Sequence, residues 1–393
     1  MTAKRSLQTA FYLGVALSLG CHGHVVRSAP NHSGAPFDFS DHPECSPAAR
    51  PAEPPAPGEV EMRYLGAAGL YLHWGEDSIL LGPFFSNPGL FRVLLGAWRA
   101  DEAAIDHGLD GIDVPAVEAI FAGHSHYDHI GDLPVVLGRA GRARVFVNRS
   151  GVHALAPYAA GRGTAFEDHA NEWVWLTGEK GERRPVRFRA VRSDHAPQVD
   201  HYLWQGNELK QDLKEWTAHR FHDLKAGQPF ALVIDLMSGD LKTVRYRMYY
   251  QDSANSWGTG EPPLFDGRAY DLAVLCIASY DKAPGQPGSI LTRLRPRHVL
   301  VTHYDDFFRP QARPVRFVGL LTEAKVDRYL RKICEVLGCE GAGAGPVNPV
   351  CGPSGPRWTM PLPGEWMRFP ASAGPAMTSP VERSGSSPPL GDG

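Results

Sequence analysis

The stretch HSHYDHIGD, residues 124–132, holds three histidines and two aspartates within nine positions. It follows directly on the short apolar run VEAIFAG (117–123), whose pattern predicts a buried β-strand. In an extended or gently turning segment, side chains two positions apart point the same way, so His124, His126 and Asp128 can converge on one side. Neutral imidazole and carboxylate are the ligands of catalytic zinc sites, so the stretch predicts metal binding at the end of a strand.

His129 diverges from these three side chains as the chain turns, so two neighbouring metal ions could share the turn. The alternative is a solvated histidine-rich loop, or a set of buried histidines held by hydrogen bonds. Further candidate ligands at the ends of other strand-like runs favour the metal site. These candidates are His195 in SDH, Asp252 in YYQD and His303 in VTH.

The pattern between residues 59 and 370 is mainly that of strands. The strand-like runs are VEMRYLGAAGLYLHW (60–74), DSILLGPFF (77–85), ARVFVNRS (143–150), VRFRAVRSDH (186–195), FALVIDL (230–236), KTVRYRMYYQD (242–252), DLAVLCIAS (271–279) and HVLVTHYDD (298–306). The turn signal GED separates the first two runs and predicts a hairpin. Fewer helical segments interleave with these strands in two comparable halves, which predicts two packed sheets with helices outside.

One helix is predicted over residues 321–338, LTEAKVDRYLRKICEVLG. Thr322 is the expected N-cap and Gly338 the expected stop. The apolar face comprises Val326, Leu330, Ile333 and Leu337. The segment is therefore expected to pack as an amphipathic surface helix.

The segments HSHYDH, SDH, YYQDS and VTHYDD resemble, in that order, the hallmark of the metallo-β-lactamase superfamily, which is HxHxDH followed by a later His, an Asp and a final His. The resemblance runs from the opening hairpin to the strand that carries His303. It implies an α/β fold, namely an αββα sandwich of two mixed β-sheets with outer helices. One departure is Gly82 in LLGP, where relatives often place an aspartate that supports the metal ligands.

Carried over residue by residue, the resemblance implies a site for two zinc ions. His124, His126 and His195 would hold one ion, Asp128, His129 and His303 the other, and Asp252 would bridge both. Asp128 would also act in catalysis by orienting a metal-bridging hydroxide. Manganese or iron(II) also accept mixed histidine and carboxylate ligands, so Mn²⁺ or Fe²⁺ could take the place of Zn²⁺.

The implied activity is metal-dependent hydrolysis of an ester-type bond, in a phosphodiester, a phospholipid or a lactone. A bridging carboxylate such as Asp252 is typical of phosphodiesterases, lactonases, thioesterases and nucleases, and is not used by the true β-lactamases. The HxHYDH wording is most similar to the branch with lactonases and N-acyl-phosphatidylethanolamine phospholipase D. Two alternatives stay open: an iron-loaded oxidoreductase on the same fold, against which His126 in place of glutamate argues, and a non-catalytic metal-binding envelope lipoprotein.

Residues 196–229 form a long segment, rich in aromatic residues and histidine, directly after His195. We interpret it as a flap over the site, with an insertion that packs its own small core as the alternative. The aromatic candidates for an apolar substrate pocket are Tyr202, Trp204, Trp216 and Phe221, and the candidates for contact with developing charge are His219 and His222.

The N-terminal residues predict export to the bacterial cell envelope. Lys4 and Arg5 precede the short apolar stretch FYLGVALSLGC, which is typical of a signal peptide over residues 1–21. LSLGC resembles the lipobox of bacterial lipoproteins, although Ser18 stands where leucine is preferred, so Cys21 is a candidate lipid anchor. The alternatives are an incidental thiol at Cys21 and a periplasmic or secreted protein.

The flanking segments predict the domain organisation. A Pro/Ala-rich linker over residues 22–58 would hold a hydrolase domain at 59–370 off the membrane, and a Ser/Pro/Gly-rich tail at 371–393 is expected to be disordered. The expected partner besides the membrane is a small-molecule or lipid substrate. A formal net charge of −3 gives no basic field for nucleic acid.

Cysteine usage adds one expectation. Apart from Cys21 there are five cysteines, an odd number, so at least one thiol stays unpaired in an oxidising compartment. Cys276 lies in an apolar run and is expected to be buried. Cys334, Cys339 and Cys351 cluster toward the end of the chain and could supply a disulfide, with a pairing that the sequence leaves open.

Overall fold

The computed structural model describes residues 47–96, 98–196, 208–214, 224–263, 266–311, 315–319, 321–339, 354–355 and 357–370. The predicted signal peptide with Cys21, most of the linker and the tail lie outside these residues. So do Cys45, Cys351 and the six aromatic and histidine candidates of the predicted flap. Within the described part of the chain, the helices are too short or too polar to cross a membrane.

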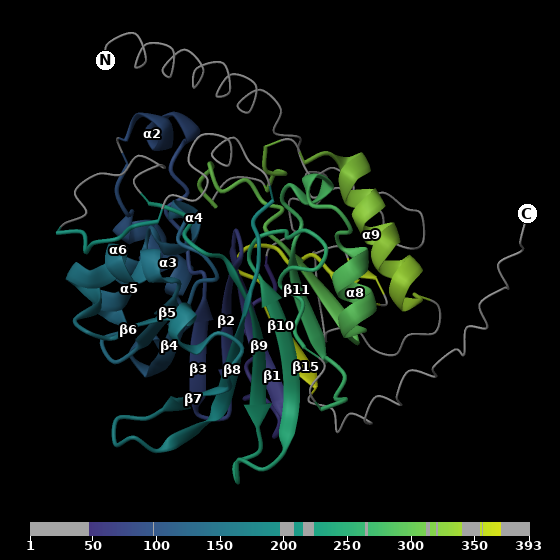
Figure 1. Ribbon diagram of the computed structural model, residues 1–393, viewed down its shortest axis with the longest axis horizontal. Helices are drawn as coiled ribbons and strands as arrows, with labels where there is room; N and C mark the ends of the chain where they lie inside the picture. The colour runs from purple at the N-terminus through teal and green to yellow at the C-terminus, as the bar shows by residue number, and fades with distance from the viewer. Residues whose placement is uncertain are drawn as a thin grey trace, which may run out of the picture.

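The first sheet has seven strands in the order β15-β1-β2-β3-β4-β5-β6 (Figure 1). Its strands are β1 (Glu59–Gly66), β2 (Gly69–Trp74), β3 (Asp77–Leu81), β4 (Val117–Phe121), β5 (Arg144–Val147), β6 (Gly163–Ala165) and β15 (Trp366–Pro370). β15, β1, β2 and β3 pair antiparallel, whereas β3, β4, β5 and β6 pair parallel. The sheet is therefore mixed. The histidine stretch follows β4, one of its parallel strands.

The second sheet has eight strands in the order β13-β14-β12-β11-β10-β9-β8-β7. Its strands are β7 (Val174–Thr177), β8 (Arg183–Arg192), β9 (Phe230–Met237), β10 (Val244–Gln251), β11 (Leu272–Cys276), β12 (His298–Thr302), β13 (Ser354–Gly355) and β14 (Trp358–Thr359). β10, β11, β12 and β14 run parallel, and the other pairs are antiparallel.

The two sheets pack face to face. Phe121 of β4 meets Phe188 of β8 with ring centroids 4.9 Å apart, and the indole N–H of Trp74 on β2 donates to the carbonyl of Met237 on β9 at 3.0 Å. Both inner faces are apolar, so the core lies between the sheets.

Helices cover the outer faces, with one set flanking β4 to β6 and the other flanking β11 (Figure 1). The helices are α2 (Leu90–Leu95), α3 (Glu102–Leu109), α4 (Tyr127–Ile130), α5 (Leu133–Arg139), α6 (Arg149–Ala159), α8 (Gly288–Leu294) and α9 (Glu323–Leu337), with short 3-10 turns at η1 (Val114–Ala116), η2 (Phe166–His169) and η3 (Tyr280–Lys282). The predicted sandwich of two mixed sheets with outer helices is thereby confirmed.

One predicted strand is wrong in its extent. The run 60–74 is not a single strand but the hairpin of β1 and β2, because the chain reverses between Gly66 and Gly69. Gly66 and Ala67 adopt left-handed φ angles of +96° and +50°, which no extended strand accommodates. The reversal also contacts the second sheet, since the carbonyl of Ala67 accepts a hydrogen bond from the backbone N–H of His303 at 2.6 Å.

The predicted helix is confirmed as α9, which begins after the cap Thr322 and ends at Leu337, with Gly338 as its C-cap. The Thr322 hydroxyl accepts from the backbone N–H of Lys325. The buried side chains are Val326, Tyr329, Leu330 and Ile333, whereas Leu337 is only half-buried. The prediction did not include Tyr329, because tyrosine carries a polar hydroxyl and is found both in protein cores and at the surface.

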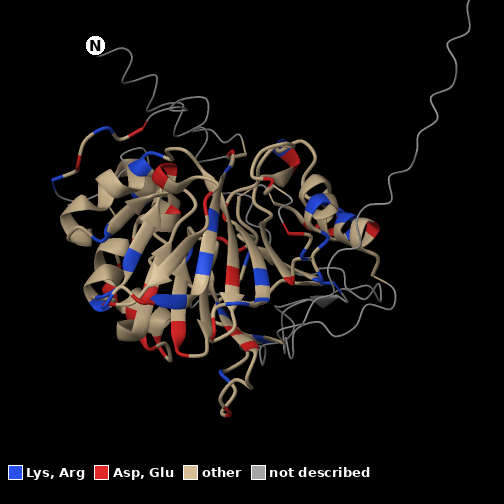
Figure 2. Cartoon of the chain, turned by 60° about the horizontal axis from the view of Figure 1, so that its bottom comes forward, with Lys and Arg blue, Asp and Glu red and all other residues tan. Residues whose placement is uncertain are grey.

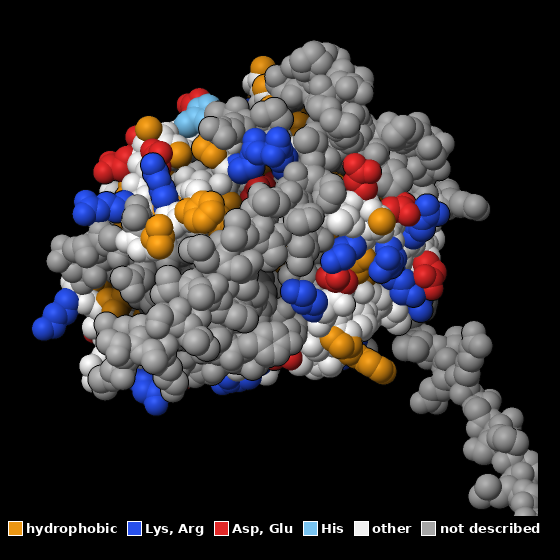
Figure 3. Space-filling model, turned by 90° about the horizontal axis from the view of Figure 1, so that it is seen from above, with side chains coloured by type: hydrophobic (Ala, Val, Ile, Leu, Met, Phe, Trp, Pro, Cys, Tyr) orange, Lys and Arg blue, Asp and Glu red, His pale blue; other side chains and the backbone are white. Residues whose placement is uncertain are grey.

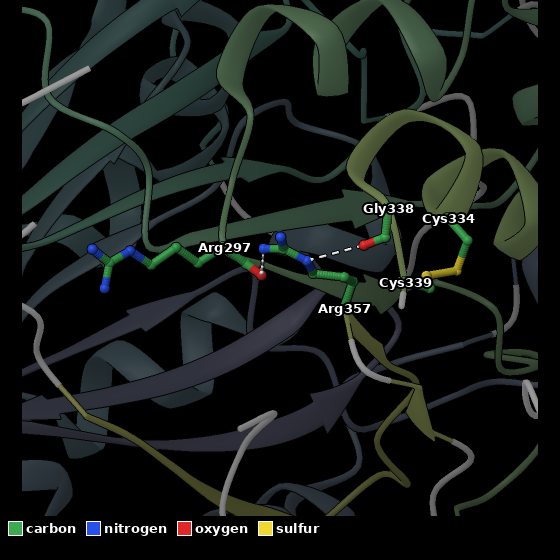
Figure 4. The surroundings of a disulfide bond; sticks show 5 residues. All are labelled: Arg297, Cys334, Gly338, Cys339 and Arg357. Carbon is green, nitrogen blue, oxygen red and sulfur yellow. Dashed lines mark hydrogen bonds between the residues drawn. A yellow bond between two sulfur atoms is a disulfide. The ribbon is translucent and has the colours of Figure 1, made fainter. Parts of the chain in front are cut away.

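A disulfide joins Cys334 to Cys339 at the C-terminal end of α9 (Figure 4). Beside it, the guanidinium of Arg357 donates to the carbonyls of Gly338 at 3.2 Å and Arg297 at 3.1 Å. The pairing answers the question that the sequence left open for these two cysteines, and Cys276 is buried and free, as expected.

Charged residues interrupt the strands of the second sheet (Figure 2). Arg187 of β8 and Arg247 of β10 both donate to the carboxylate of Asp235 on β9, which lies between them in the register. Arg247 also donates twice to Asp266. The cluster ties three neighbouring strands together through one fully buried carboxylate.

Candidate metal centre

Four chain segments meet at one end of the sandwich, each just past the end of a strand. His124 follows β4, His195 follows β8, Asp252 follows β10 and His303 follows β12. The histidine stretch crosses from the first sheet to the second, where Gly123 donates its N–H to Asp252 Oδ2 at 2.7 Å and accepts from Phe230 N at 2.8 Å. A side chain at Gly123 would lie 2.5 Å from Asp252 Oδ1, so only glycine allows this approach.

The first group of potential ligands comprises His124, His126 and His195, whose ligand atoms lie within 4.8 Å of one another. His124 Nε2 is 3.0 Å from His126 Nδ1, and the ring centroids of His126 and His195 are 4.8 Å apart. His195 Nδ1 lies 2.8 Å from the carbonyl oxygen of Ala196, which can only accept, so this nitrogen carries the proton. Nε2 is then the metal-binding nitrogen of His195.

The second group comprises Asp128, His129 and His303, all buried. Asp128 Oδ2 lies 3.3 Å from His303 Nε2 and 3.5 Å from His129 Nε2. His303 holds a left-handed φ of +61°, and its backbone N–H bonds to the turn between β1 and β2. Unusual backbone conformations of this kind concentrate at functional sites, where the surrounding structure enforces them.

Asp252 lies between the two groups and forms a third potential ligand set with His124 and His129. Its Oδ1 lies 3.0 Å from His124 Nδ1, and its Oδ2 lies 3.7 Å from His129 Nδ1. The structure thus brings all seven predicted residues together. Their roles as metal ligands, and the bridging role of Asp252, stay predictions.

Burial sets the charge of these side chains. Desolvation lowers the pKa of His129 to about 3 and holds the pKa of His124 well below its usual range. Burial would raise the pKa of Asp128, but the neighbouring imidazoles of His129 and His303 outweigh it and hold this pKa far below its usual value. Neutral imidazole beside ionised carboxylate is the protonation state that binds metal without first losing protons.

The donor set fits a divalent metal pair. Each group offers three nitrogen or oxygen donors within reach of a single ion, and thiolate is absent from both groups. Imidazole with carboxylate suits Zn²⁺ and also Mn²⁺ or Fe²⁺. Three protein donors for each ion leave a coordination position for water or substrate.

Sequence reasoning passed over two buried carboxylates that support the centre. Asp132, at the end of the opening stretch, accepts from the backbone N–H of Phe85 at 2.7 Å and of Ser86 at 2.9 Å, and so ties the loop after β3 to α5. Asp305 accepts from Ala67 N at 2.9 Å and from the Tyr64 hydroxyl. The sequence could have pointed to both residues, because Asp132 lies in HSHYDHIGD and Asp305 in VTHYDD, the segments that carry the predicted ligands.

An aromatic wall, made of Tyr127, Phe307 and Phe308, flanks the second ligand group. Phe307 packs its ring edge-on against His303 at 5.0 Å, and Tyr127 lies 6.3 Å from both phenylalanine rings. The end of the molecule that carries α2 also bears separate hydrophobic side chains among charged ones on its described surface (Figure 3). The polar histidine and aspartate cluster thus has the apolar aromatic wall on one side.

Comparison with known proteins agrees with the motif. The chain is 24% identical over 293 residues to a UPF0173 metal-dependent hydrolase of Cupriavidus taiwanensis, covering 70% of this chain and 85% of the relative. It is also 24% identical over 280 residues to a UPF0173 metal-dependent hydrolase of Thermus thermophilus, covering 71% and 98%. No family model matches the chain.

Among solved structures, a metallo hydrolase of the archaeon Ignicoccus hospitalis aligns with a TM-score of 0.43 at 15% identity, covering 79% of this chain and 98% of that one. The sequence relatives and the two-sheet architecture agree with the resemblance to the metallo-β-lactamase superfamily drawn from the motif.

Proposed function

We propose that the protein is a metal-dependent hydrolase of the metallo-β-lactamase superfamily that uses two zinc ions to cleave an ester-type bond. One observation carries the proposal: seven histidines and aspartates from four strand ends converge in a largely buried cluster, in which Asp252 lies between two three-residue groups. Burying this many polar groups is costly unless they are paired or bind metal. The sequence relatives, named metal-dependent hydrolases, support the same activity.

The side chains divide the work between the two groups. His124, His126 and His195 would hold one ion, and Asp128, His129 and His303 the other. Bound ions of this kind supply a water of lowered pKa and polarise the attacked oxygen. Asp128, fixed between His129 Nε2 and His303 Nε2, would accept a hydrogen bond from the attacking water and so orient it.

The substrate we propose is a phosphodiester, a phospholipid or a lactone. The motif resemblance supports this class, and the aromatic wall beside His303 offers an apolar contact for the part of the substrate that does not react. A lipid anchor at Cys21, with residues 22–58 as a tether in the cell envelope, would confine the enzyme to a membrane surface. These envelope assignments rest on sequence patterns alone.

Hydrolysis by the zinc-loaded full chain tests the proposal. Phosphodiesters, phospholipids and lactones are offered in turn to the wild type, to Asp128→Ala and to Asp106→Ala, an exposed aspartate on α3 that serves as the matched control. We expect turnover of one class, lost by at least 100-fold in Asp128→Ala and unchanged in Asp106→Ala. Equal turnover in wild type and Asp128→Ala, or redox activity of an iron-loaded chain without hydrolysis, would contradict it.

A further inference from the structure

The large apolar side chains that the described residues expose lie at the end of the molecule that carries the metal centre. They are Phe91, Leu95 and Trp257, which are 55%, 66% and 75% exposed. Phe91 and Leu95 belong to α2 in the connection after β3, and Trp257 lies in the loop after β10, shortly beyond Asp252. Figure 1 shows α2 at the top of the sandwich, the end that also carries α4. Exposed apolar side chains that gather in one place mark interaction sites, whereas single ones are ordinary.

Packing on both sides of α2 holds the helix at this end. Phe84 precedes it and Trp98 follows it, and their rings meet edge-on at 6.2 Å. Both rings also pack at 5.8 Å against Tyr127 of the histidine stretch, and Val93 points inward from the helix with 2% of its surface exposed. The outward face of α2 therefore belongs to an element that is fixed to the metal-binding segment.

The outward face of α2 combines apolar side chains with positive charge. Its two exposed apolar side chains are four residues apart, so they lie on one face of the helix. Arg92 within the helix and Arg99 after it are exposed, and residues 82–100 contain these two charges and no acidic residue. Asp101, the next charged residue, caps α3 with its side chain. Apolar side chains flanked by arginines are typical of elements that lie in a membrane interface and contact anionic lipids.

The predicted tether joins the described chain at the same end. A Cβ on Gly364 would lie 3.5 Å from Cγ of Pro47, the first described residue. Gly364 donates its N–H to the carbonyl of Tyr64 at 2.7 Å, and the Tyr64 hydroxyl accepts from the backbone N–H of His303 at 3.2 Å. An anchor at Cys21 would thus be attached beside the metal centre, which favours approach of this end to the membrane.

We propose that the end carrying the metal centre docks on an anionic lipid surface. Phe91 and Leu95 enter the interface, and Arg92 and Arg99 contact the lipid phosphates. The inference goes beyond hydrolysis and uses the lipid anchor of the proposed function only for the direction of approach. Docking in this orientation turns the metal centre toward the bilayer, so an amphiphilic substrate reaches it from the membrane side.

Hydrogen exchange of the full chain on vesicles tests the docking face locally. The vesicles contain phosphatidylethanolamine with about 30% phosphatidylglycerol, which supplies anionic phosphates. We expect amides of residues 89–96 to exchange roughly threefold more slowly on vesicles, and those of residues 238–243, in the turn between β9 and β10 at the opposite end, to stay unchanged. The anchor lies outside both segments, so it does not produce this pattern. Equal exchange of residues 89–96 with and without vesicles would overturn the proposal.

Substitutions on α2 test the apolar contact in a Cys21→Ser background, which removes the site of lipidation. Phe91→Ser, Leu95→Ser is compared with the parent chain and with Leu241→Ser, a half-buried leucine in the turn between β9 and β10. We expect the double variant to bind the same vesicles roughly 10-fold more weakly in cosedimentation, and Leu241→Ser to bind like the parent. Parent-like binding of the double variant would contradict the proposed contact.

The arginines have a separate test. In the same background, Arg92→Gln, Arg99→Gln should weaken binding to the anionic vesicles by roughly 30-fold and leave binding to pure phosphatidylcholine unchanged. Arg183→Gln is the matched control, because Arg183 is exposed at the start of β8, the end of that strand remote from the metal centre. Equal losses in both variants would contradict docking through α2, as would weaker binding to both kinds of vesicle.

These measurements use neither turnover nor bound metal, so docking and hydrolysis fail separately. A chain that docks as described yet hydrolyses nothing would contradict the proposed function and leave the docking face supported. Hydrolysis by a chain whose residues 89–96 stay unprotected on vesicles would do the reverse. Protection of those residues by a soluble protein, with no vesicle binding, would replace the lipid surface with a protein partner and overturn the proposal.

Discussion

At the scale of single residues, the metal centre depends on buried polar groups whose protonation is set by their neighbours. Asp128 stays ionised because two imidazoles face its Oδ2, and His129 stays neutral because it is buried. Glu365 shows the same physics away from the centre. It is fully buried at the start of the region that forms β15, and desolvation raises its pKa to about 7.

The raised pKa of Glu365 makes stability depend on pH. Because the folded chain holds this proton more tightly than the unfolded chain, the contribution is present below about pH 4.5 and is lost as the pH rises to about 7. Between pH 5 and pH 8 the loss amounts to roughly 2 to 3 kcal/mol. We expect Glu365→Gln to remove this part of the pH dependence, as measured by urea unfolding at both values.

Glu335→Gln is the matched control for that measurement, because Glu335 is exposed on α9 and pairs with the neighbouring Lys332. Its unfolding free energy should follow the wild type at both pH values. If Glu365→Gln also follows the wild type, burial does not control the protonation of Glu365.

At the scale of elements, the strand ends deliver the ligands, and the sequence predicts this well. Alternating apolar runs ending in His or Asp marked β4, β8, β10 and β12, and the periodicity of α9 marked its buried face. The turn at Ala67 was missed, because a left-handed residue in an apolar run leaves no compositional trace. The orientation of Asp252 was also beyond the sequence, which places a residue at a strand end but not on a given side of an imidazole.

Replacement of Asp235 on β9 tests how strongly the buried charge cluster stabilises the second sheet. Removing its carboxylate takes a fully buried ionic partner from the buried Arg247, while Asp266 still accepts from it, so we expect Asp235→Ala to lower the unfolding free energy by about 3 kcal/mol. Asp266→Ala is the matched control, because Asp266 is 40% exposed and its loss should cost less than about 1 kcal/mol. Equal losses in thermal or urea unfolding would mean that burial of Asp235 is not decisive.

At the scale of the whole molecule, the sandwich positions the centre where two mixed sheets meet. The histidine stretch leaves the first sheet and bonds to the second through Gly123, while His303 leaves the second and bonds to the first through Ala67. Each sheet therefore contributes ligands that the other holds in place, so metal binding should stabilise the packing of the two sheets. The motif predicted the fold and the seven residues, but the contacts that cross between sheets required the structure.

Metal content is the measurement that tests the central claim most directly. The purified full chain is loaded with zinc, freed of excess metal and analysed for zinc per chain, beside His195→Ala, His303→Ala and the control His153→Ala, a partly exposed histidine of α6. The two-group centre predicts two zinc ions in the wild type and in His153→Ala, and one in each of the other variants. A wild type that binds no zinc, or His195→Ala and His303→Ala chains that both keep two, would contradict the account.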